Sequence, residues 1–184
     1  MKFKLPEKTD WMVEQNQHGP TIEYAQEINK IVSEVGFTKA LEIGCIWAVS
    51  TLSILLSQEN GTLLSVDPIP QTNPSMHAMV EVRYNELQDR WNYFTGKSEE
   101  FWKQNKERFD LIYIDGSHNY TEAKLDLFAA WLCLEKGGVL LADDYLHPHN
   151  HDNDYGVSLA VLELMQEKKI KPFHMGKHVI GFEK

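Results

Sequence analysis

Two short apolar runs of this chain each end abruptly in aspartate. Residues 109–114 (FDLIYI) lead into Asp115, and residues 138–142 (GVLLA) lead into Asp143 and Asp144. Apolar runs of this length with β-branched and aromatic members are typical of strands that are buried on both faces. If the three carboxylates come together, their charges must be neutralised, and a hard divalent cation is the simplest way to do so.

The segment between the two runs predicts that the three aspartates do come together. Residues 119–134 place Ala123, Leu127 and Trp131 at helical spacing, so a strand–helix–strand crossover joins the two runs. Such a crossover makes the two strands parallel, and their carboxyl ends then lie at the same edge of one sheet, where open α/β sheets bind ligands. The sequence therefore predicts a divalent-metal site on the three aspartates, with Mg²⁺ as the expected ion.

Other roles stay open for these carboxylates. Asp115 could cap the next helix, although Asn119 and Glu122 already form a capping pair there. Asp143 and Asp144 could belong to a solvated turn. As neighbours after a buried strand they point to opposite faces, so one could bind the ion while the other lies behind it.

His118 is the residue of this edge best suited to move a proton. It follows Asp115 by three positions and would lie near any hydroxyl group bound to the metal. An imidazole titrates near neutral pH, so His118 is the expected general base. The alternative is a polar loop residue.

A second group of signals precedes this edge. Residues 41–51 (LEIGCIWAVST) are typical of a strand, a turn of small residues and the start of a helix, whose N-terminus favours negative charge on a ligand. Asp67 ends the next strand, where a carboxylate can accept both ribose hydroxyls of an adenosine cofactor or form a turn. Gly96 and Ser98 follow the third strand, where an adenine ring would lie.

The order of these signals resembles the class I S-adenosylmethionine-dependent methyltransferases. More narrowly, it is similar to the small-molecule O-methyltransferases related to the macrolide-sugar and catechol enzymes. Their pattern of Glu-x-Gly-x-x-x-Gly-x-Ser-Thr, Val-Asp-Pro, Asp-Gly-x-His and Asp-Asp-Tyr appears here within residues 38–165, as Glu42, Gly44, Ser50 and Thr51, then Asp67, then Asp115 to His118, then Asp143 to Tyr145.

The resemblance implies a fold, a cofactor and a reaction. The fold would be a Rossmann-like, doubly wound α/β sheet of seven strands, the last of them antiparallel, with helices on both faces. A small-molecule hydroxyl, held by the metal, would lose its proton to His118 and accept the methyl group. S-adenosylmethionine would bind to residues spread over four strand ends: Glu42, Gly44 and Ser50 near its methionine part, Asp67 on its ribose, and Gly96, Ser98 and Asp115.

One residue departs from the family pattern. Ala48 stands where the family has its second glycine, and its methyl group could crowd the methionine part of the cofactor or be tolerated by a wider turn. A NAD enzyme fits less well, because Gly-x-Gly-x-x-Gly is absent and Ile46 and Trp47 fill the loop. A rival interpretation is a non-catalytic protein that binds S-adenosylmethionine or a nucleotide and has kept only the fold.

Strand-like and helical segments alternate from residue 21 onward. We expect one domain over residues 21–184, preceded by a polar arm over residues 1–20. The predicted strands are 40–43, 62–66, 91–95, 109–114 and 138–142, followed by a terminal hairpin of 170–175 and 178–182. The predicted helices are 21–35, 50–58, 75–88, 98–107, 119–134 and 157–168.

Composition narrows the class of protein further. The 184 residues carry a net charge of −9, which disfavours a binder of nucleic acid or of an anionic membrane. No apolar run approaches the roughly 20 residues of a membrane span, and the first residues (MKFKLPEKTD) lack a signal-peptide core, so we expect a cytoplasmic protein. Cys45 and Cys133 are expected to be reduced thiols. A homodimer is an open alternative to a monomer.

Three histidines alternate in a proline-containing loop near the predicted edge. His147, His149 and His151, with Asp152, could bind a transition metal. Because alternating histidines in such a loop lack fixed geometry, a solvated loop on the substrate side is the expected role.

Overall fold

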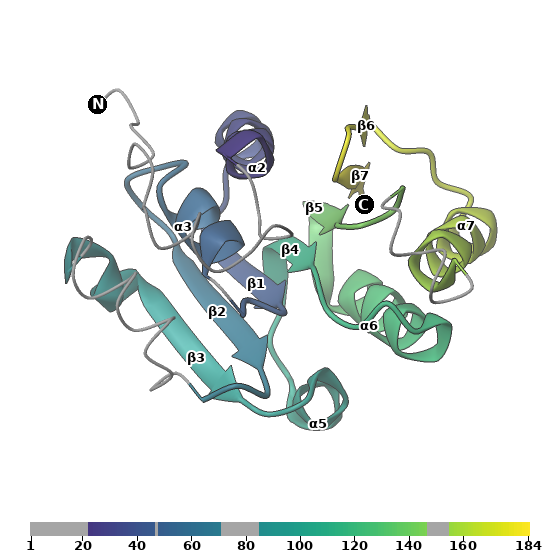
Figure 1. Ribbon diagram of the computed structural model, residues 1–184, viewed down its shortest axis with the longest axis horizontal. Coiled ribbons are helices and arrows are strands. Elements are labelled where there is room, and N and C mark those ends of the chain that lie inside the picture. Colours follow the sequence, from purple (N-terminus) through teal and green to yellow (C-terminus); the bar gives the residue numbers. More distant parts are fainter. Residues whose placement is uncertain (1–21, 47, 71–84, 147–154) are drawn as a thin grey trace.

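A mixed seven-stranded sheet organises the molecule (Figure 1). The computed structural model describes residues 22–46, 48–70, 85–146 and 155–184. The order across the sheet is β3-β2-β1-β4-β5-β7-β6, and β7 alone runs opposite to the direction that the other six strands share. The strands are β1 Lys39–Ile43, β2 Thr62–Asp67, β3 Trp91–Thr95, β4 Phe109–Ile114, β5 Leu134–Ala142, β6 His174–Met175 and β7 Ile180–Glu183.

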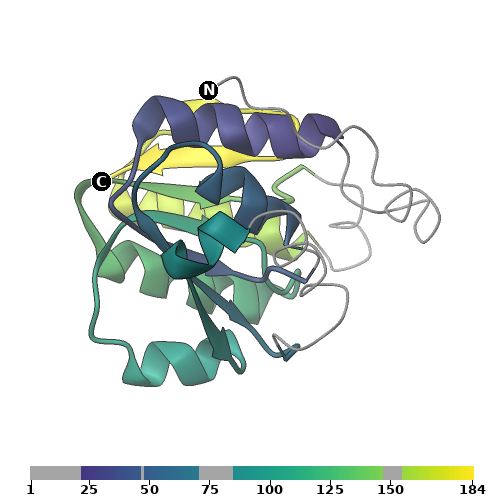
Figure 2. The ribbon, with the colours of Figure 1, turned by 90° about the vertical axis from the view of Figure 1, so that its left-hand side faces the viewer.

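Helices cover both faces of the sheet (Figures 1 and 2). Helices α2 (Ile22–Val35) and α3 (Val49–Leu55) pack on one face, and α5 (Ser98–Gln104), α6 (Tyr120–Cys133) and α7 (Gly156–Lys168) pack on the other. The predicted doubly wound fold with an antiparallel last strand is therefore confirmed. None of the helices in the described ranges is long and apolar enough to cross a bilayer.

Strand β4 shows why apolar and polar residues do not alternate along the apolar runs. Leu111 and Tyr113 face the core under α2 and α3, whereas Ile112 and Ile114 face the core under α6 and α7. Successive side chains of a strand point to opposite faces, so a strand covered on both sides must be apolar at every position.

Local signals set the ends of several helices as predicted. The side chain of Asn119 accepts a hydrogen bond from the Thr121 amide at the start of α6, which is the expected cap. Gly36 ends α2 in a left-handed conformation, with its amide bonded to the Val32 carbonyl.

Three predicted helices differ from the structure. The helix predicted over 50–58 ends at Leu55, and the one predicted over 98–107 ends at Gln104, where the Asn105 side chain accepts from the Glu107 amide instead. Of the helix predicted over 75–88, residues 75–84 lie outside the described residues, and the rest belongs to a 3-10 helix, η1 (Asn85–Arg90).

Residues 21–184 were predicted as one domain, and every strand named above belongs to the same sheet. The expected arm over residues 1–20 lies outside the described residues, as do the loop histidines His147, His149 and His151.

The crossover through α6 places the carboxyl ends of β4 and β5 together, beside that of β1. Strands β4 and β5 are parallel, with Leu111 paired to Val139 and Ile114 to Ala142. Backbone hydrogen bonds continue one residue past the strands, from the Asp115 amide to the Ile43 carbonyl and from the Asp143 amide to the Ile114 carbonyl. The carboxyl ends of β1, β4 and β5 are therefore held in register at one edge.

Candidate functional site

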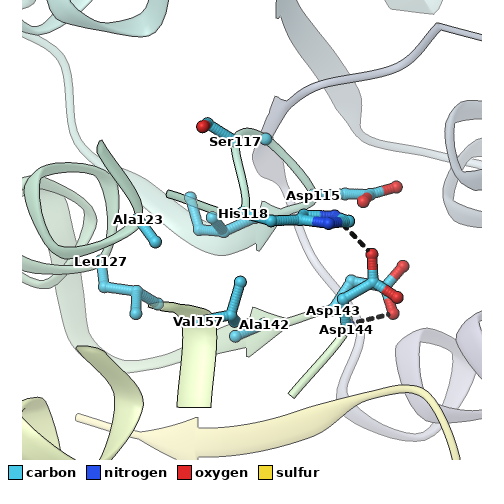
Figure 3. A pocket seen from close by; sticks show the side chains of 11 residues that line it. Asp115, Ser117, His118, Ala123, Leu127, Ala142, Asp143, Asp144 and Val157 are labelled. Atoms are coloured by element: carbon cyan, nitrogen blue, oxygen red, sulfur yellow. Dashed lines mark hydrogen bonds and ion pairs between the residues drawn. The ribbon is translucent and has the colours of Figure 1, made fainter. Parts of the chain in front are cut away.

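Asp115, His118 and Asp144 meet at this edge. One ligand atom from each lies within 4.8 Å of the others, and the His118 Nε2 atom is 2.7 Å from Asp144 Oδ2. In Figure 3 the three side chains converge on the same side of the pocket, while Ala123, Leu127 and Val157 form its apolar side. The structure thus brings together two predicted metal ligands and the predicted base.

Negative charge is concentrated at this edge. Burial, and then the charges of Asp143 and Asp144, raise the pKa of Asp115 well above its usual value. Burial and the charge of Asp144 likewise raise the pKa of Asp143. The hydrogen bond to Asp144 raises the pKa of His118. Because like charges destabilise one another in a buried site, a cation that binds here would relieve this repulsion.

Asp143 makes different contacts from the other two aspartates of the edge, Asp115 and Asp144. Its Oδ1 atom accepts the Asp144 amide at 2.8 Å, and its Oδ2 atom lies 2.6 Å from the Tyr24 hydroxyl and 2.8 Å from the Tyr113 hydroxyl. The side chain is 4% exposed. Asp143 is therefore enclosed by protein donors, whereas Asp115 and Asp144 lie beside His118.

The two tyrosines were not found from the sequence. Tyr24 lies among the apolar residues of a predicted helix, and Tyr113 among those of a predicted strand, so neither stands out as a site residue. Tyr24 lies four positions before Ile28 on the buried face of α2, so helical spacing could have placed it on the sheet side. Nothing local indicates that it reaches Asp143, 119 residues away.

The glycine of the turn after β1 permits a close contact between strands. Gly44 has φ +83°, and a Cβ atom at this position would lie 1.8 Å from the Asp115 carbonyl oxygen. The missing side chain thus lets the end of β1 lie directly against the end of β4. Ala48, at the predicted glycine position, is buried and left-handed with φ 54°, and Trp47 lies outside the described residues.

Asp67 connects the end of β2 to this turn. Its Oδ2 atom accepts the Cys45 amide at 2.9 Å, and its Oδ1 atom accepts the Ile69 amide at 2.8 Å. The residue is 4% exposed. Each carboxylate oxygen can accept more than one hydrogen bond, so these backbone contacts are compatible with ribose hydroxyls as further donors.

Glu42 lies beneath the start of α3 in a fully buried polar cluster. Its Oε2 atom accepts the Thr51 hydroxyl at 2.7 Å and the Ser65 hydroxyl at 2.5 Å, and its carboxyl group also interacts with Ser50. Its Oε1 atom is buried with no hydrogen-bond partner in the described structure. Burial raises the pKa of Glu42 to about 7. Through these hydrogen bonds Glu42 holds the side chains of Ser50 and Thr51 in place at the start of α3.

The two residues predicted beside the adenine have protein contacts. Ser98 forms a hydrogen bond with Asp126, a buried acid of α6 that sequence reasoning missed. The Trp102 indole also donates to Asp126 at 2.7 Å. A Cβ atom on Gly96 would meet the Phe94 ring at 2.6 Å. Ser98 thus contacts α6 through a hydrogen bond, and the absence of a side chain at Gly96 leaves room for the Phe94 ring.

The comparisons with known proteins agree with this architecture. A chain with this sheet order and these helices has the class I methyltransferase fold. Residues 41–145 match the family model described as a methyltransferase domain, and the chain belongs to this family of enzymes. No curated protein sequence matches the chain closely enough to count as a relative.

Solved structures of methyltransferases superpose on most of the chain. An O-methyltransferase from Bacillus cereus in complex with SAH has a TM-score of 0.71 at 18% identity, over 94% of this chain and 86% of that one. The SAH-bound Podospora anserina methyltransferase PaMTH1 has a TM-score of 0.76 at 15% identity, over 95% and 84%. The O-methyltransferase TomG from Streptomyces achromogenes, in complex with SAM, has a TM-score of 0.70 at 12% identity, over 89% and 81%.

Proposed function

We propose that this methyltransferase transfers the methyl group of S-adenosylmethionine to a hydroxyl group of a small molecule with the help of a divalent cation. The observation that carries the proposal is the meeting of Asp115, His118 and Asp144, whose ligand atoms lie within 4.8 Å of one another at the sheet edge. Carboxylates beside an imidazole provide both a cation site and a group that can accept a proton.

The donor set fits a hard cation. Asp115 and Asp144 supply carboxylate oxygens, which Mg²⁺ and similar ions prefer. Burial, and after it the charges of Asp143 and Asp144, raise the pKa of Asp115, and a cation would favour its ionised form. We propose Asp115 and Asp144 as ligands. Asp143, the third predicted ligand, is enclosed by Tyr24 and Tyr113. It would either support the two ligands without contacting the ion or move toward the ion and bind it.

The proposed cofactor site uses the turn after β1 and the end of β2. Asp67 would accept the ribose hydroxyls, while Gly44, Ser50 and Glu42 shape the turn that faces the methionine part. Asp115, Gly96 and Ser98 would border the remainder. This proposal is supported by the placement of Asp67 against the turn at Cys45, and by the structural neighbours in complex with SAH or SAM.

The residues of the edge have separate parts in the proposed reaction. The bound cation would lower the pKa of the substrate hydroxyl, and S-adenosylmethionine would supply the electrophilic methyl group. His118 would accept the hydroxyl proton. Because Asp144 Oδ2 contacts its Nε2 atom, the neutral ring holds its hydrogen there and its Nδ1 atom is the acceptor. The apolar side chains Ala123, Leu127 and Val157 would exclude water.

Calorimetric titration with S-adenosylhomocysteine, with and without Mg²⁺, tests the cofactor assignment. We expect micromolar-scale affinity, and Asp67→Ala should weaken it by roughly 1.5–3 kcal/mol, the range for charge-assisted hydrogen bonds. Asp110→Ala is the matched control, because the Asp110 carboxylate also accepts two backbone amides, those of Thr38 and Lys39, at the opposite end of the strands. Equal affinity in the Asp67 and Asp110 variants would remove the ribose assignment.

A second measurement separates an enzyme from a binding protein that kept the fold. Labelled S-adenosylmethionine is incubated with a panel of small hydroxyl compounds, with Mg²⁺ or with EDTA. Methyl transfer that stops in EDTA supports the metal-assisted reaction. Tight cofactor binding without transfer to any compound of the panel would favour the non-catalytic alternative.

A further inference from the structure

A tyrosine from outside the acidic edge reaches two of its carboxylates. The Tyr24 hydroxyl of α2 lies 2.6 Å from Asp143 Oδ2 and 3.1 Å from Asp115 Oδ2. It also lies 2.8 Å from the Tyr113 hydroxyl, which itself is 2.8 Å from Asp143 Oδ2. Four side chains from three parts of the chain thus form one buried cluster of oxygen atoms.

Counting hydrogen atoms shows how this cluster is arranged. Each tyrosine hydroxyl carries a single hydrogen. If both tyrosines donate to Asp143 Oδ2, the two contacts to that oxygen use both hydrogens. The contacts of the Tyr24 hydroxyl with Tyr113 and with Asp115 Oδ2 are then close approaches without a tyrosine hydrogen between the oxygens. A phenol ordinarily loses its hydrogen only at a pH of about 10, so both tyrosines keep these hydrogens at neutral pH. Asp143 then accepts three hydrogen bonds, because its Oδ1 atom also accepts the Asp144 amide.

The bond to the Asp144 amide has a consequence for His118. Asp144 has φ 55°, a sparsely populated left-handed conformation that persists only where surrounding contacts hold it. Asp143 Oδ1 holds the amide of this strained residue at 2.8 Å. In the same conformation Asp144 Oδ2 contacts His118 Nε2. The orientation of Asp143 is therefore transmitted through one peptide unit to the proposed base.

We propose that Tyr24 is a positioning residue of the metal site, acting by fixing the carboxylate of Asp143 and contacting that of Asp115. This inference rests on the proposed function, since it concerns the cation that Asp115 and Asp144 would hold. Carboxylates that bind metals need partners that fix their orientation, and loss of such a partner typically lowers metal affinity 10–100-fold. Tyr113 donates to the same Asp143 oxygen from the neighbouring strand β4, so the two tyrosines act together.

The test is Mn²⁺ binding to the full chain, measured by the electron paramagnetic resonance signal of the free ion. We expect Tyr24→Phe to weaken Mn²⁺ binding by a factor of 10 to 100, because only the hydroxyl is lost. Tyr120→Phe is the matched control. It removes another tyrosine bond to a carboxylate, at 2.5 Å from Glu163, on the outer side of α6 and α7. Its Mn²⁺ affinity should equal that of the unmodified protein.

The possible results separate the two proposals. If the unmodified protein does not bind Mn²⁺, the metal-assisted function fails. If it binds and Tyr24→Phe binds equally well, the function stands and the role of Tyr24 is wrong. The double variant Tyr24→Phe/Tyr113→Phe should lose less than the product of the single losses, because both hydroxyls serve one oxygen. Independent losses would show that the hydroxyls do not share Asp143.

Discussion

Neutral donors hold the buried carboxylates of this protein in place. Backbone amides fix Asp67, and tyrosines together with a backbone amide fix Asp143. A neutral donor orients a carboxylate without cancelling its charge, so the negative potential remains available to a ligand. At the scale of the residue, the edge is therefore ordered and still acidic, which suits a cation and a basic imidazole.

Replacement of His118 tests whether this imidazole is the base. His118→Ala should lower kcat by roughly 10²–10⁴, the usual contribution of a positioned proton acceptor. Affinity for S-adenosylhomocysteine should not change, because the proposed ribose contact lies at Asp67. The rate–pH profile of the unmodified enzyme should have a rising limb that the variant lacks. A variant with the same kcat and the same limb would show that the cation alone activates the hydroxyl.

Glu42 should make the folded state less stable as the pH rises. Its pKa is about 7 in the folded state, against 4.5 for an ordinary glutamate, so between these values the folded protein keeps a proton that the unfolded chain has lost. The free energy of unfolding should therefore fall from pH 4.5 to 7 and level off above, by at most roughly 3 kcal/mol from this residue.

The measurement is urea unfolding of the unmodified protein and of Glu42→Gln at several pH values. The glutamine can still accept hydrogen bonds from Thr51 and Ser65 but does not titrate. The difference in unfolding free energy between the two proteins should shift in favour of Glu42→Gln as the pH rises through this window. A constant difference would show that Glu42 ionises normally in its buried site.

At the scale of the element, periodicity predicts most of this fold. The runs at residues 109–114 and 138–142 and the helical spacing between them were sufficient for the crossover and the common edge. Contacts between distant segments were not predictable, because Tyr24 meets Asp143 across 119 residues through the packing of α2. The left-handed turn at Asp144 also carries no sequence signal, since aspartate adopts this conformation only where its surroundings fix it.

Two of the glycines with positive φ, Gly44 and Gly137, provide a matched test of the contact between β1 and β4. Gly44→Ala should destabilise the protein by about 3 kcal/mol or more, because the new methyl group would collide with the Asp115 carbonyl. Gly137→Ala has a similar φ of +78° but nothing within 4 Å of the added Cβ atom, so only the backbone strain of roughly 1–2 kcal/mol should appear. Chemical denaturation of both variants gives the comparison, and equal losses would refute the close contact.

At the scale of the whole molecule, acidic residues outnumber basic ones. The net charge of −9 means that any salt screens repulsion within the folded protein, so a stabilising effect of Mg²⁺ is not by itself proof of a site. The acidic edge differs from this general charge because Asp143 is buried, Asp115 and Asp144 are half-buried, and protein contacts hold all three in place. Stabilisation by Mg²⁺ at a specific site should therefore depend on single residues of the edge, whereas stabilisation by general screening should not.

Thermal unfolding in MgCl₂ and in NaCl of equal ionic strength separates these effects. Mg²⁺ should raise Tm beyond NaCl, with a stabilisation of about 2.7 kcal/mol when the ion is present at 100 times its Kd. EDTA should remove the difference. Asp115→Asn should show the same response to both salts, whereas Glu167→Gln, an exposed acid on α7, should behave as the unmodified protein. A residual Mg²⁺ effect in Asp115→Asn would place the ion elsewhere.

The hydroxyl of Tyr24 belongs to a helix that ends before residue 41, where the match to the methyltransferase domain begins. The segment that matches the family model is therefore shorter than the segment that supplies the acidic edge, which includes Tyr24 of α2. Two chains can share every residue of the signature and still surround its aspartates differently, according to the helix that each places ahead of the first strand. Transplanting residues 41–145 into another scaffold would carry the aspartates without this hydroxyl, so the recipient would have to provide its own.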